Sequence, residues 1–229
     1  MGQATSGYLL QTGRHSILLD CGSGVLGQLQ QYTELEEIDA VVLSHYHHDH
    51  VADLGCLQYA ARVLMDLGQR DKPLDIYGHA EDGNFAGLTY HAFTRGHAID
   101  TDTPLCLGDV TFTFQRNVHP DPCFSMRVES NGKVLAYISD TQWEDGLVQT
   151  AKDADLLICE SSLYNEYKGV VSGHLTAGEA GRIAQEAHAK SLVLSHLPHF
   201  GNHADLVAQA AGVFNGPVEL AETGKIWEL

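Results

Sequence analysis

Basic side chains are scarce in this sequence of 229 residues, which has 13 lysines and arginines against 30 acidic residues and a formal charge of −17. A surface of that charge repels nucleic acids and anionic lipids in general, so a polyanion would need a local positive site. No apolar run approaches the length of a membrane span, and the first residues show no signal-peptide pattern. We therefore expect a cytoplasmic protein without a membrane partner.

The sequence also lacks a Pro/Ser-rich linker or a low-complexity tract that would divide it. A chain of this length can bury roughly 70–75% of its unfolded surface in one domain, so we predict a single domain over residues 1–229. The cysteines are odd in number and mostly have apolar neighbours, which favours reduced core residues over a disulfide framework. They are Cys21, Cys56, Cys106, Cys123 and Cys159.

The most informative stretch is a buried strand that runs into a cluster of metal-binding side chains. The apolar run 40–43 predicts a strand covered on both faces. It is followed by His45, His47, Asp49 and His50. Side chains of these types packed so closely resist desolvation unless a divalent cation makes them ligands. By alternation, the first two can share one metal, and the last two, at the start of a helix, can turn to a second.

Further strands supply single candidate ligands. His119 and Asp140 each follow a predicted strand, and they gain weight because four ligands cannot complete two metal sites. The stretch 192–196 (LVLSH) echoes 41–45 (VVLSH), which suits two related halves, with a chance repeat of common strand residues as the alternative. We interpret His79 as a surface turn residue, His48 as structural and His199 as a rim residue.

The periodicity predicts the remaining elements. Expected strands are 6–12 and 15–21, joined as a hairpin, then 74–77, 110–114, 124–130, 134–138, 156–159, 192–196 and 217–221. Expected helices are 25–32, the stretch from His50 to the stop at Gly68, 80–90, 177–188 with Thr176 as cap and Glu179 three residues on, and 203–214.

The H-x-H-x-D-H pattern of residues 45–50 resembles the signature of the metallo-β-lactamase-fold hydrolases. The resemblance spans essentially the whole chain and implies an α/β fold, a four-layer αββα sandwich with its active site at the edge of the two sheets. It implies that Asp20 supports the histidine loop. It also implies two ions about 3.5–4 Å apart that hold a bridging hydroxide, zinc first, with manganese or iron as alternatives. The implied ligands are His45, His47 and His119 for one metal, Asp49, His50 and His196 for the other, and Asp140 as the bridge, with Asp49 also counted as catalytic.

Glu160, which follows the predicted strand 156–159, and His174 in the segment 173–177 resemble ribonuclease Z within that family. There the histidine is thought to help the leaving oxygen depart while the glutamate orients it. A strand-end glutamate and a helix-start histidine without function are the alternative. Ribonuclease Z carries a long basic arm that grips tRNA, and this chain has no such insertion, so we expect no stable tRNA complex.

Small bacterial ribonuclease-Z-like hydrolases are a closer match, because they share residues 4–9 (ATSGYL). In those relatives a first strand precedes this segment, so that strand is expected to be missing here. Family members are commonly dimers, which implies a homodimer.

Three functions fit these observations. The first is a dinuclear metal-dependent phosphodiesterase for small or short, nucleotide-type phosphodiesters. The second is a hydrolase of carboxylic esters, thioesters or lactones, in which Glu160 and His174 have no evident task. The third is a non-catalytic, metal-stabilised binding module. An antibiotic hydrolase is disfavoured, because β-lactamases of the commonest type have a cysteine near the place of Asp140 and lack the histidine that His50 provides.

Overall fold

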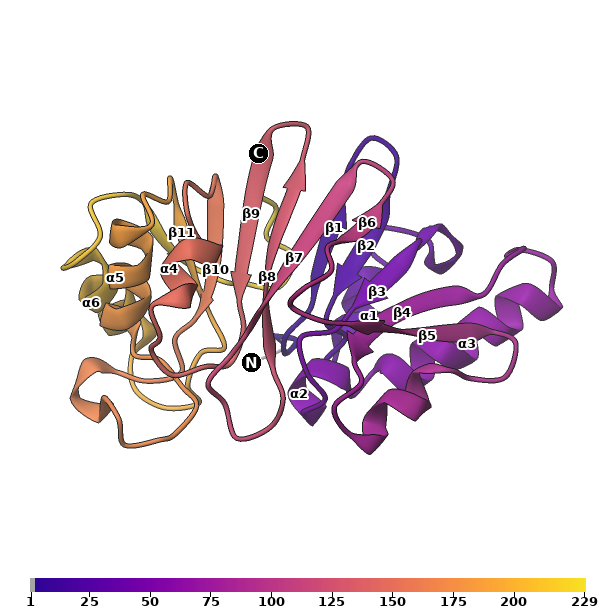
Figure 1. Cartoon of the computed structure of the whole chain (residues 1–229), viewed down its shortest axis with the longest axis horizontal. Helices are drawn as coiled ribbons and strands as arrows, with labels where there is room; N and C mark the ends of the chain where they lie inside the picture. Colours follow the sequence, from indigo (N-terminus) through magenta and orange to yellow (C-terminus); the bar gives the residue numbers. More distant parts are fainter. Residues whose placement is uncertain (1–2) are drawn as a thin grey trace. The chain divides into compact units, whose positions relative to one another are not determined.

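The computed structural model describes residues 3–229, which divide into two compact units, one ending at Ile99 and the next beginning at Asp100. Each unit contains one β-sheet with helices packed on it (Figure 1). The predicted mixed α/β class with two sheets is therefore confirmed.

The first unit holds a five-stranded sheet in the order β1-β2-β3-β4-β5. Its strands are β1 (Tyr8–Gln11), β2 (Ser16–Leu19), β3 (Ala40–Val42), β4 (Leu74–His79) and β5 (Thr94–Ile99). The first two form the predicted antiparallel hairpin, and β2 to β5 are parallel. The helices are α1 (Val25–Leu29), α2 (His48–Val51) and α3 (Leu54–Asp66), with 3-10 turns η1 (Leu35–Glu37) and η2 (Gly83–Leu88).

Apolar residues of α1 and α3 pack against the middle strands of this sheet. Val25 and Leu57 from these helices share a core cluster with Val41 and Ile76 from the strands. Every residue of β3 is buried, as predicted for a strand covered on both faces. Each large side chain so buried stabilises the unit by roughly 1.5–3 kcal/mol, which fixes the strand that leads into the histidine motif.

The second unit holds a seven-stranded sheet in the order β12-β11-β10-β9-β8-β7-β6. Its strands are β6 (Leu105–Leu107), β7 (Val110–Arg116), β8 (Phe124–Ser130), β9 (Lys133–Ile138), β10 (Leu156–Glu160), β11 (Leu192–Ser195) and β12 (Val218–Leu220). Strands β6 to β9 pair antiparallel and β9 to β12 parallel. The predicted hairpin turn at Asn131-Gly132 is confirmed, with φ of 51° and 74° at its two residues.

Helices α4 (Gly146–Thr150), α5 (Ala177–Glu186) and α6 (His203–Ala211) lie on one face of the parallel strands, and a 3-10 turn η3 (Asn165–Tyr167) precedes α5 (Figure 1). The start of α5 is the predicted one: Thr176 accepts from the amide of Glu179, and the Glu179 carboxylate accepts from the amide of Thr176. Such a reciprocal cap satisfies two backbone donors that the first turn leaves open. This cap fixes the position of Thr176, which directly follows His174 and Leu175 in the chain.

Several expectations were wrong. His79 is buried at 1% exposure as the last residue of β4, not a surface turn residue. Residues 83–88 form a 3-10 turn rather than an α-helix. Strand β5 was missed because its burial does not alternate, and β6 because it has only three residues. All five cysteines are free as expected, but Cys56 and Cys106 are exposed.

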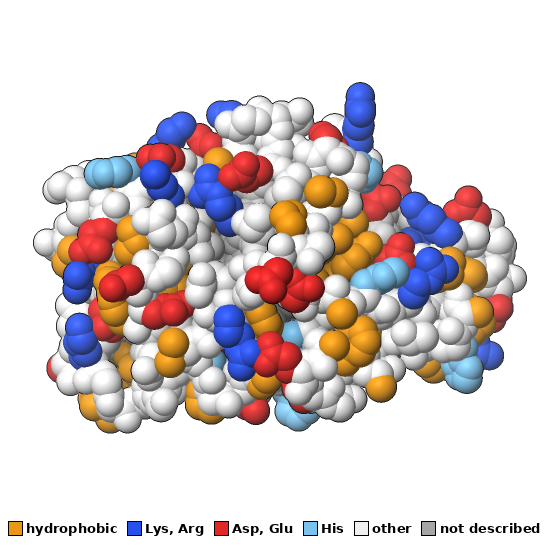
Figure 2. Space-filling view, in the orientation of Figure 1, with side chains coloured by type: hydrophobic (Ala, Val, Ile, Leu, Met, Phe, Trp, Pro, Cys, Tyr) orange, Lys and Arg blue, Asp and Glu red, His pale blue; other side chains and the backbone are white. Residues whose placement is uncertain are grey.

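The helices between residues 3 and 229 include none that is long and apolar enough to cross a membrane. On the face drawn in Figure 2, lysine and arginine side chains are interspersed with acidic ones and form no continuous basic patch.

The strand directions decide where the polar residues gather. The carboxyl ends of parallel strands meet at one edge of a sheet. In the first unit, β2, β3 and β4 therefore deliver Asp20, the 45–50 motif and His79 to one edge. In the second unit, β9 and β10 deliver Asp140 and Glu160 to one edge, and β11 ends there beside His196.

Candidate metal centre

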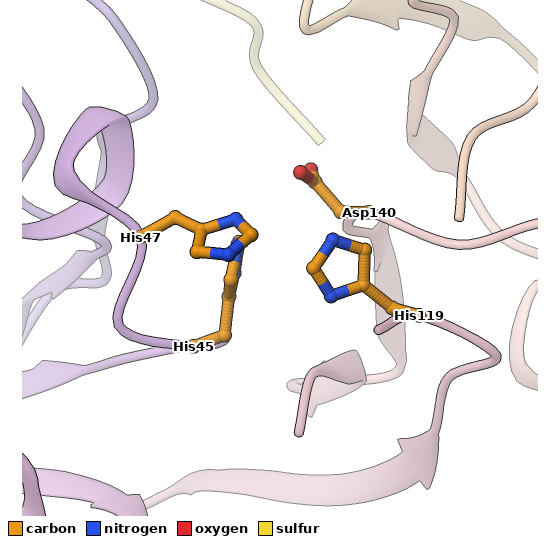
Figure 3. A group of neighbouring side chains, drawn as sticks. All are labelled: His45, His47, His119 and Asp140. Carbon is orange, nitrogen blue, oxygen red and sulfur yellow. The ribbon is translucent and has the colours of Figure 1, made fainter. Parts of the chain in front are cut away.

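Four predicted ligands lie together in the first unit. Figure 3 shows His45 and His47 on the loop that leaves β3, and it also draws His119 and Asp140 on two loops of the second unit. The ring centroid of His45 lies 4.6 Å from that of His47 and 4.2 Å from that of His50. His50 Nε2 lies 3.7 Å from an oxygen of Asp49. His48, in contrast, is exposed, which agrees with its separation from this group.

Asp20 is the buried carboxylate that orders this loop. One of its oxygens accepts from the Ser44 amide at 2.7 Å, and the other accepts from the Ser44 hydroxyl at 2.8 Å and from His50 Nδ1 at 2.8 Å. Asp20 and His50 are 0% and 1% exposed. A carboxylate bonded to Nδ1 of a histidine fixes the tautomer and aims Nε2 outward, the arrangement seen around metal-ligating histidines. Asp20 therefore has the supporting role that the family resemblance implied.

The segment 4–9, which carried the sequence resemblance, holds the backbone of Asp49. The Asp49 carbonyl accepts from the Thr5 hydroxyl at 2.7 Å and from the Ser6 amide at 3.1 Å. Gly22 passes so near that a Cβ there would lie 2.0 Å from this carbonyl oxygen. This close approach requires glycine at position 22 and explains the Gly-rich turn after Asp20.

Tyr46, between the first two histidines, anchors their loop to the end of β4. Its hydroxyl donates to the His79 carbonyl at 2.6 Å, and the two rings lie 4.3 Å apart. A Cβ at Gly78 would come within 2.6 Å of the Tyr46 hydroxyl. The buried His79 thus packs under the motif, a role that its position in the sequence did not indicate.

In the second unit, Asp140, His174 and His196 offer ligand atoms that all lie within 4.8 Å of one another. His196 Nε2 is 3.4 Å from a carboxylate oxygen of Asp140. The rings of His174 and His196 stack at 5.4 Å, and those of His119 and His174 lie 5.9 Å apart. The sequence predicted all four residues, and the structure brings them together within this unit.

The hydrogen bonds at Nδ1 test whether these residues fit a divalent metal. His119 Nδ1 faces the backbone of Asp121, 3.0 Å from its carbonyl oxygen and 3.3 Å from its amide nitrogen. His50 Nδ1 contacts the Asp20 carboxylate and His196 Nδ1 the Ser162 hydroxyl. In each ring Nδ1 is thus engaged within the chain, which leaves Nε2 as the nitrogen for a metal ion. Imidazoles with carboxylates suit zinc, manganese or iron. The donor set fits a divalent ion.

Glu160 is a hub of hydrogen bonds at the end of β10. It is 1% exposed, and its two oxygens lie within hydrogen-bond distance of five donors. These are the amides of Thr141, Ser162 and Leu175, the Ser162 hydroxyl and His174 Nδ1, at 2.8 to 3.3 Å. These contacts fix the position of the carboxylate, so Glu160 can orient His174.

His174 has a pKa above the 6.5 of an ordinary histidine. Burial lowers the pKa, but the hydrogen bond and charge of Glu160, with the charge of Asp140, outweigh that effect. The imidazolium form, which can give a proton, is favoured by the same carboxylate that orients the ring.

Asn117, which the sequence gave no reason to select, ties the turn of His119 to the turn of Asp140. It is 4% exposed, and its amide group donates to the carbonyls of Ser139 and Asp140 at 3.3 and 3.0 Å. Its oxygen accepts from the Ser125 amide at 3.2 Å. A buried amide that serves two neighbouring turns holds their side chains in register.

Asn117→Ala is expected to lower the free energy of unfolding by about 1–3 kcal/mol, because it leaves buried carbonyls and an amide without partners. Urea unfolding of the metal-free protein measures this. The control is Asn215→Ala, because Asn215 is exposed and bonds only to Gln185. Equal stability of the two variants would contradict the role given to Asn117.

Gly173 allows His119 to lie where it does. It has φ of +86°, and a Cβ there would lie 2.8 Å from His119 Cδ2 and 2.7 Å from Pro120 Cδ. Both the backbone conformation and the close approach favour glycine. The glycine of the 173–177 segment is thus explained by geometry in this unit.

The sequence predicted the ligand candidates together with Asp20 and Glu160, but not the other residues that hold them. Ser44, Tyr46, Asn117 and Ser162 lack a spacing signal of their own, and only the Ser-His echo of residues 44–45 and 195–196 pointed to serine. His199 is exposed, as expected of a rim residue.

Comparison with known proteins places the chain in a family. A profile described as beta-lactamase superfamily domain matches residues 15–197. The protein named probable metallo-hydrolase YhfI, from Bacillus subtilis, is 48% identical over 99% of this chain and 93% of its own length. The crystal structure of YhfI, described as a metallo-beta-lactamase fold protein, matches with a TM-score of 0.96 at 46% identity, over 99% of this chain and 92% of that one.

Two further similarities are more distant. Ribonuclease Z of Myxococcus xanthus is 29% identical over 98% of this chain and 92% of its own length. A diphosphatase of the PhnP family has a TM-score of 0.77 at 18% identity, over 98% of this chain and 84% of that one, and this likeness concerns the fold alone. Together with the profile match and the 48% identity to YhfI, these similarities agree with the fold described above. The chain therefore belongs to the beta-lactamase superfamily, within the group that has the metallo-β-lactamase fold.

Proposed function

We propose that this protein is a dinuclear metal-dependent phosphodiesterase that acts on small or short, nucleotide-type phosphodiesters. The observation that carries the proposal is the pair His174 and Glu160, held beside Asp140 and His196 in the second unit. Cleavage of a phosphodiester needs a proton for the departing alkoxide, which is a poor leaving group. The similarity to a ribonuclease Z over 98% of the chain also supports phosphodiester chemistry.

The proposal includes a single domain over residues 1–229. The residues that would hold one ion are His45, His47 and His119, those for the other would be Asp49, His50 and His196, and Asp140 would serve both. Two bound divalent ions, zinc first, supply Lewis-acid activation of water and of the phosphoryl oxygen.

The chain's own groups have separate tasks. Asp20 keeps His50 oriented through Nδ1, and Glu160 keeps His174 oriented in the same way. His174 gives its proton to the leaving oxygen. Asp49, partly exposed with 42% of its side chain accessible, can serve as ligand and can accept a proton from water.

The preference for small substrates and against a stable tRNA complex rests on charge. With 30 acidic against 13 basic side chains, most of the surface repels a long polyanion. We also propose a homodimer and a cytoplasmic location, in line with the family resemblance and the five free cysteines.

Purified protein saturated with zinc is expected to hold close to two ions per chain, and Asp140→Ala is expected to hold fewer because it removes the shared carboxylate. Elemental analysis after gel filtration measures both. Asp145→Ala is the matched control, because Asp145 is a carboxylate of the same unit whose side chain accepts a hydrogen bond from the Trp143 indole and is not a proposed ligand.

The substrate class is tested separately on the zinc-loaded wild type. An alkyl nucleotide diester, an activated aryl diester, a thioester and a lactone form the panel, with hydrolysis of the diesters expected to exceed the others. No more than one tightly held ion would refute the dinuclear mechanism, and preferential thioester cleavage would refute the phosphodiesterase.

A further inference from the structure

The Ser162 hydroxyl lies among three side chains of the second unit, Glu160, His174 and His196. Its Oγ is 2.9 Å from Oε2 of Glu160, 2.6 Å from Nδ1 of His196 and 3.2 Å from Nδ1 of His174. The Ser162 amide also donates to the same Glu160 oxygen at 2.9 Å. Neither the family resemblance nor the comparisons give this serine a task.

One proton on the hydroxyl determines the direction of these bonds. A carboxylate can only accept, so the hydroxyl donates to Glu160 and its oxygen lone pairs remain for donors. The contact of 2.6 Å with His196 is then a bond in which Nδ1–H donates to Ser162 Oγ. In the neutral ring, this leaves Nε2 of His196 without a proton on the side where Asp140 lies at 3.4 Å.

We propose that Ser162 is a positioning residue that relays the charge of Glu160 to His196 and sets the Nδ1–H tautomer that a metal ligand needs. Glu160 then serves two histidines, His174 by a direct bond and His196 through the serine. The inference depends on the proposed function, because it takes His196 to be a metal ligand.

The first unit is built in the same way, which supports the assignment independently. There the buried Asp20 accepts from the Ser44 hydroxyl at 2.8 Å, and Ser44 Oγ lies 3.1 Å from Nδ1 of His45. In both units the carboxylate is at the end of one parallel strand, and a histidine follows the neighbouring one. A buried carboxylate, a serine and a histidine thus occur twice, with different spacing along the chain.

Ser162→Ala is expected to weaken zinc binding about 10–100-fold, the range for residues that orient metal ligands. Competition between the protein and a chromophoric zinc chelator measures the affinity without any substrate. Ser161→Ala is the matched control: its hydroxyl donates to the Ser195 carbonyl, which also accepts from the Ser161 amide and so keeps a partner. Ser162→Thr retains the hydroxyl and should restore most of the affinity.

A second measurement needs no metal. In metal-free wild-type protein, ¹⁵N imidazole NMR should report His196 in the Nδ1–H tautomer. In Ser162→Ala that signal should become a mixture of tautomers, while Ser161→Ala should resemble the wild type.

The outcomes separate the inference from the proposed function. If the wild type binds two zinc ions and Ser162→Ala binds zinc with equal affinity, the serine relay is overturned. The proposed phosphodiesterase function is then unaffected. A wild type that binds no zinc would overturn the proposed function, and the tautomer of His196 would then decide the relay alone. A predominant Nε2–H tautomer overturns it.

Discussion

His174→Ala is expected to lower the hydrolysis of an alkyl or nucleotide diester by about 10²–10⁴-fold while lowering that of an activated aryl diester only modestly. A nitrophenolate leaves without a proton, whereas an alkoxide needs one, so only the second substrate depends on the acid. Steady-state kinetics of both diesters with zinc-loaded wild type and variant measures the difference. Zinc content should be unchanged, because His174 is not among the proposed ligands.

Glu160→Gln is the companion variant. It keeps the size of the side chain and one accepting oxygen but removes the charge that raises the pKa of His174, so its losses should have the same direction and be milder. Glu160→Ala would instead leave five donors without their acceptor and perturb the fold. Equal losses on both diesters in His174→Ala would mean that His174 serves binding or structure.

Asp20→Asn is expected to weaken zinc binding by about 10–100-fold and to lower the free energy of unfolding by about 2–3 kcal/mol. Asparagine presents one oxygen and one NH₂ group where Asp20 accepts three hydrogen bonds, so at least one buried donor loses its acceptor. Asparagine is the informative replacement because Asp20 has φ of 56°, which asparagine tolerates and alanine does not.

The control for that variant is Asp39→Asn, close to the start of β3. Asp39 accepts from the Ser16 amide but is 33% exposed at its side chain, and its ion pairs with His15 and Lys72 are 3.5 and 3.9 Å long. Surface pairs of this kind contribute little. If Asp20→Asn matched Asp39→Asn in zinc affinity and in urea unfolding, the orienting role of Asp20 would be refuted.

The sequence was most informative where side chains suited to metal binding or proton transfer follow a buried parallel strand. Buried apolar runs predicted β3, β10 and β11, and parallel strands bring the residues at their ends to one edge within each sheet. Position thus marked His45, while the family resemblance was needed to select Glu160 and His196. The capping box at Thr176 and the turn at Asn131 were predictable because they are local.

What could not be predicted depends on contacts between distant parts of the chain. Asn117 is a strand-end amide like many others until its bonds to the carbonyls of Ser139 and Asp140 are seen. His79 is adjacent to a glycine and an acidic stretch, so the sequence suggested a turn, whereas packing against Tyr46 buries it. Neither contact leaves a periodic trace in the sequence.

The glycine beside His119 has a consequence for engineering. A common way to stabilise a protein is to replace glycine by alanine, which restricts the unfolded chain. At Gly173 that route is closed, because φ is +86° and the added methyl carbon would displace the histidine ring. Gly55 in α3 is different, with no atom within 4 Å of a built Cβ and no positive φ. Replacing Gly55 by alanine can therefore stabilise the protein. Gly173 must stay glycine, because the folded loop needs its backbone conformation, although glycine makes the unfolded chain more flexible.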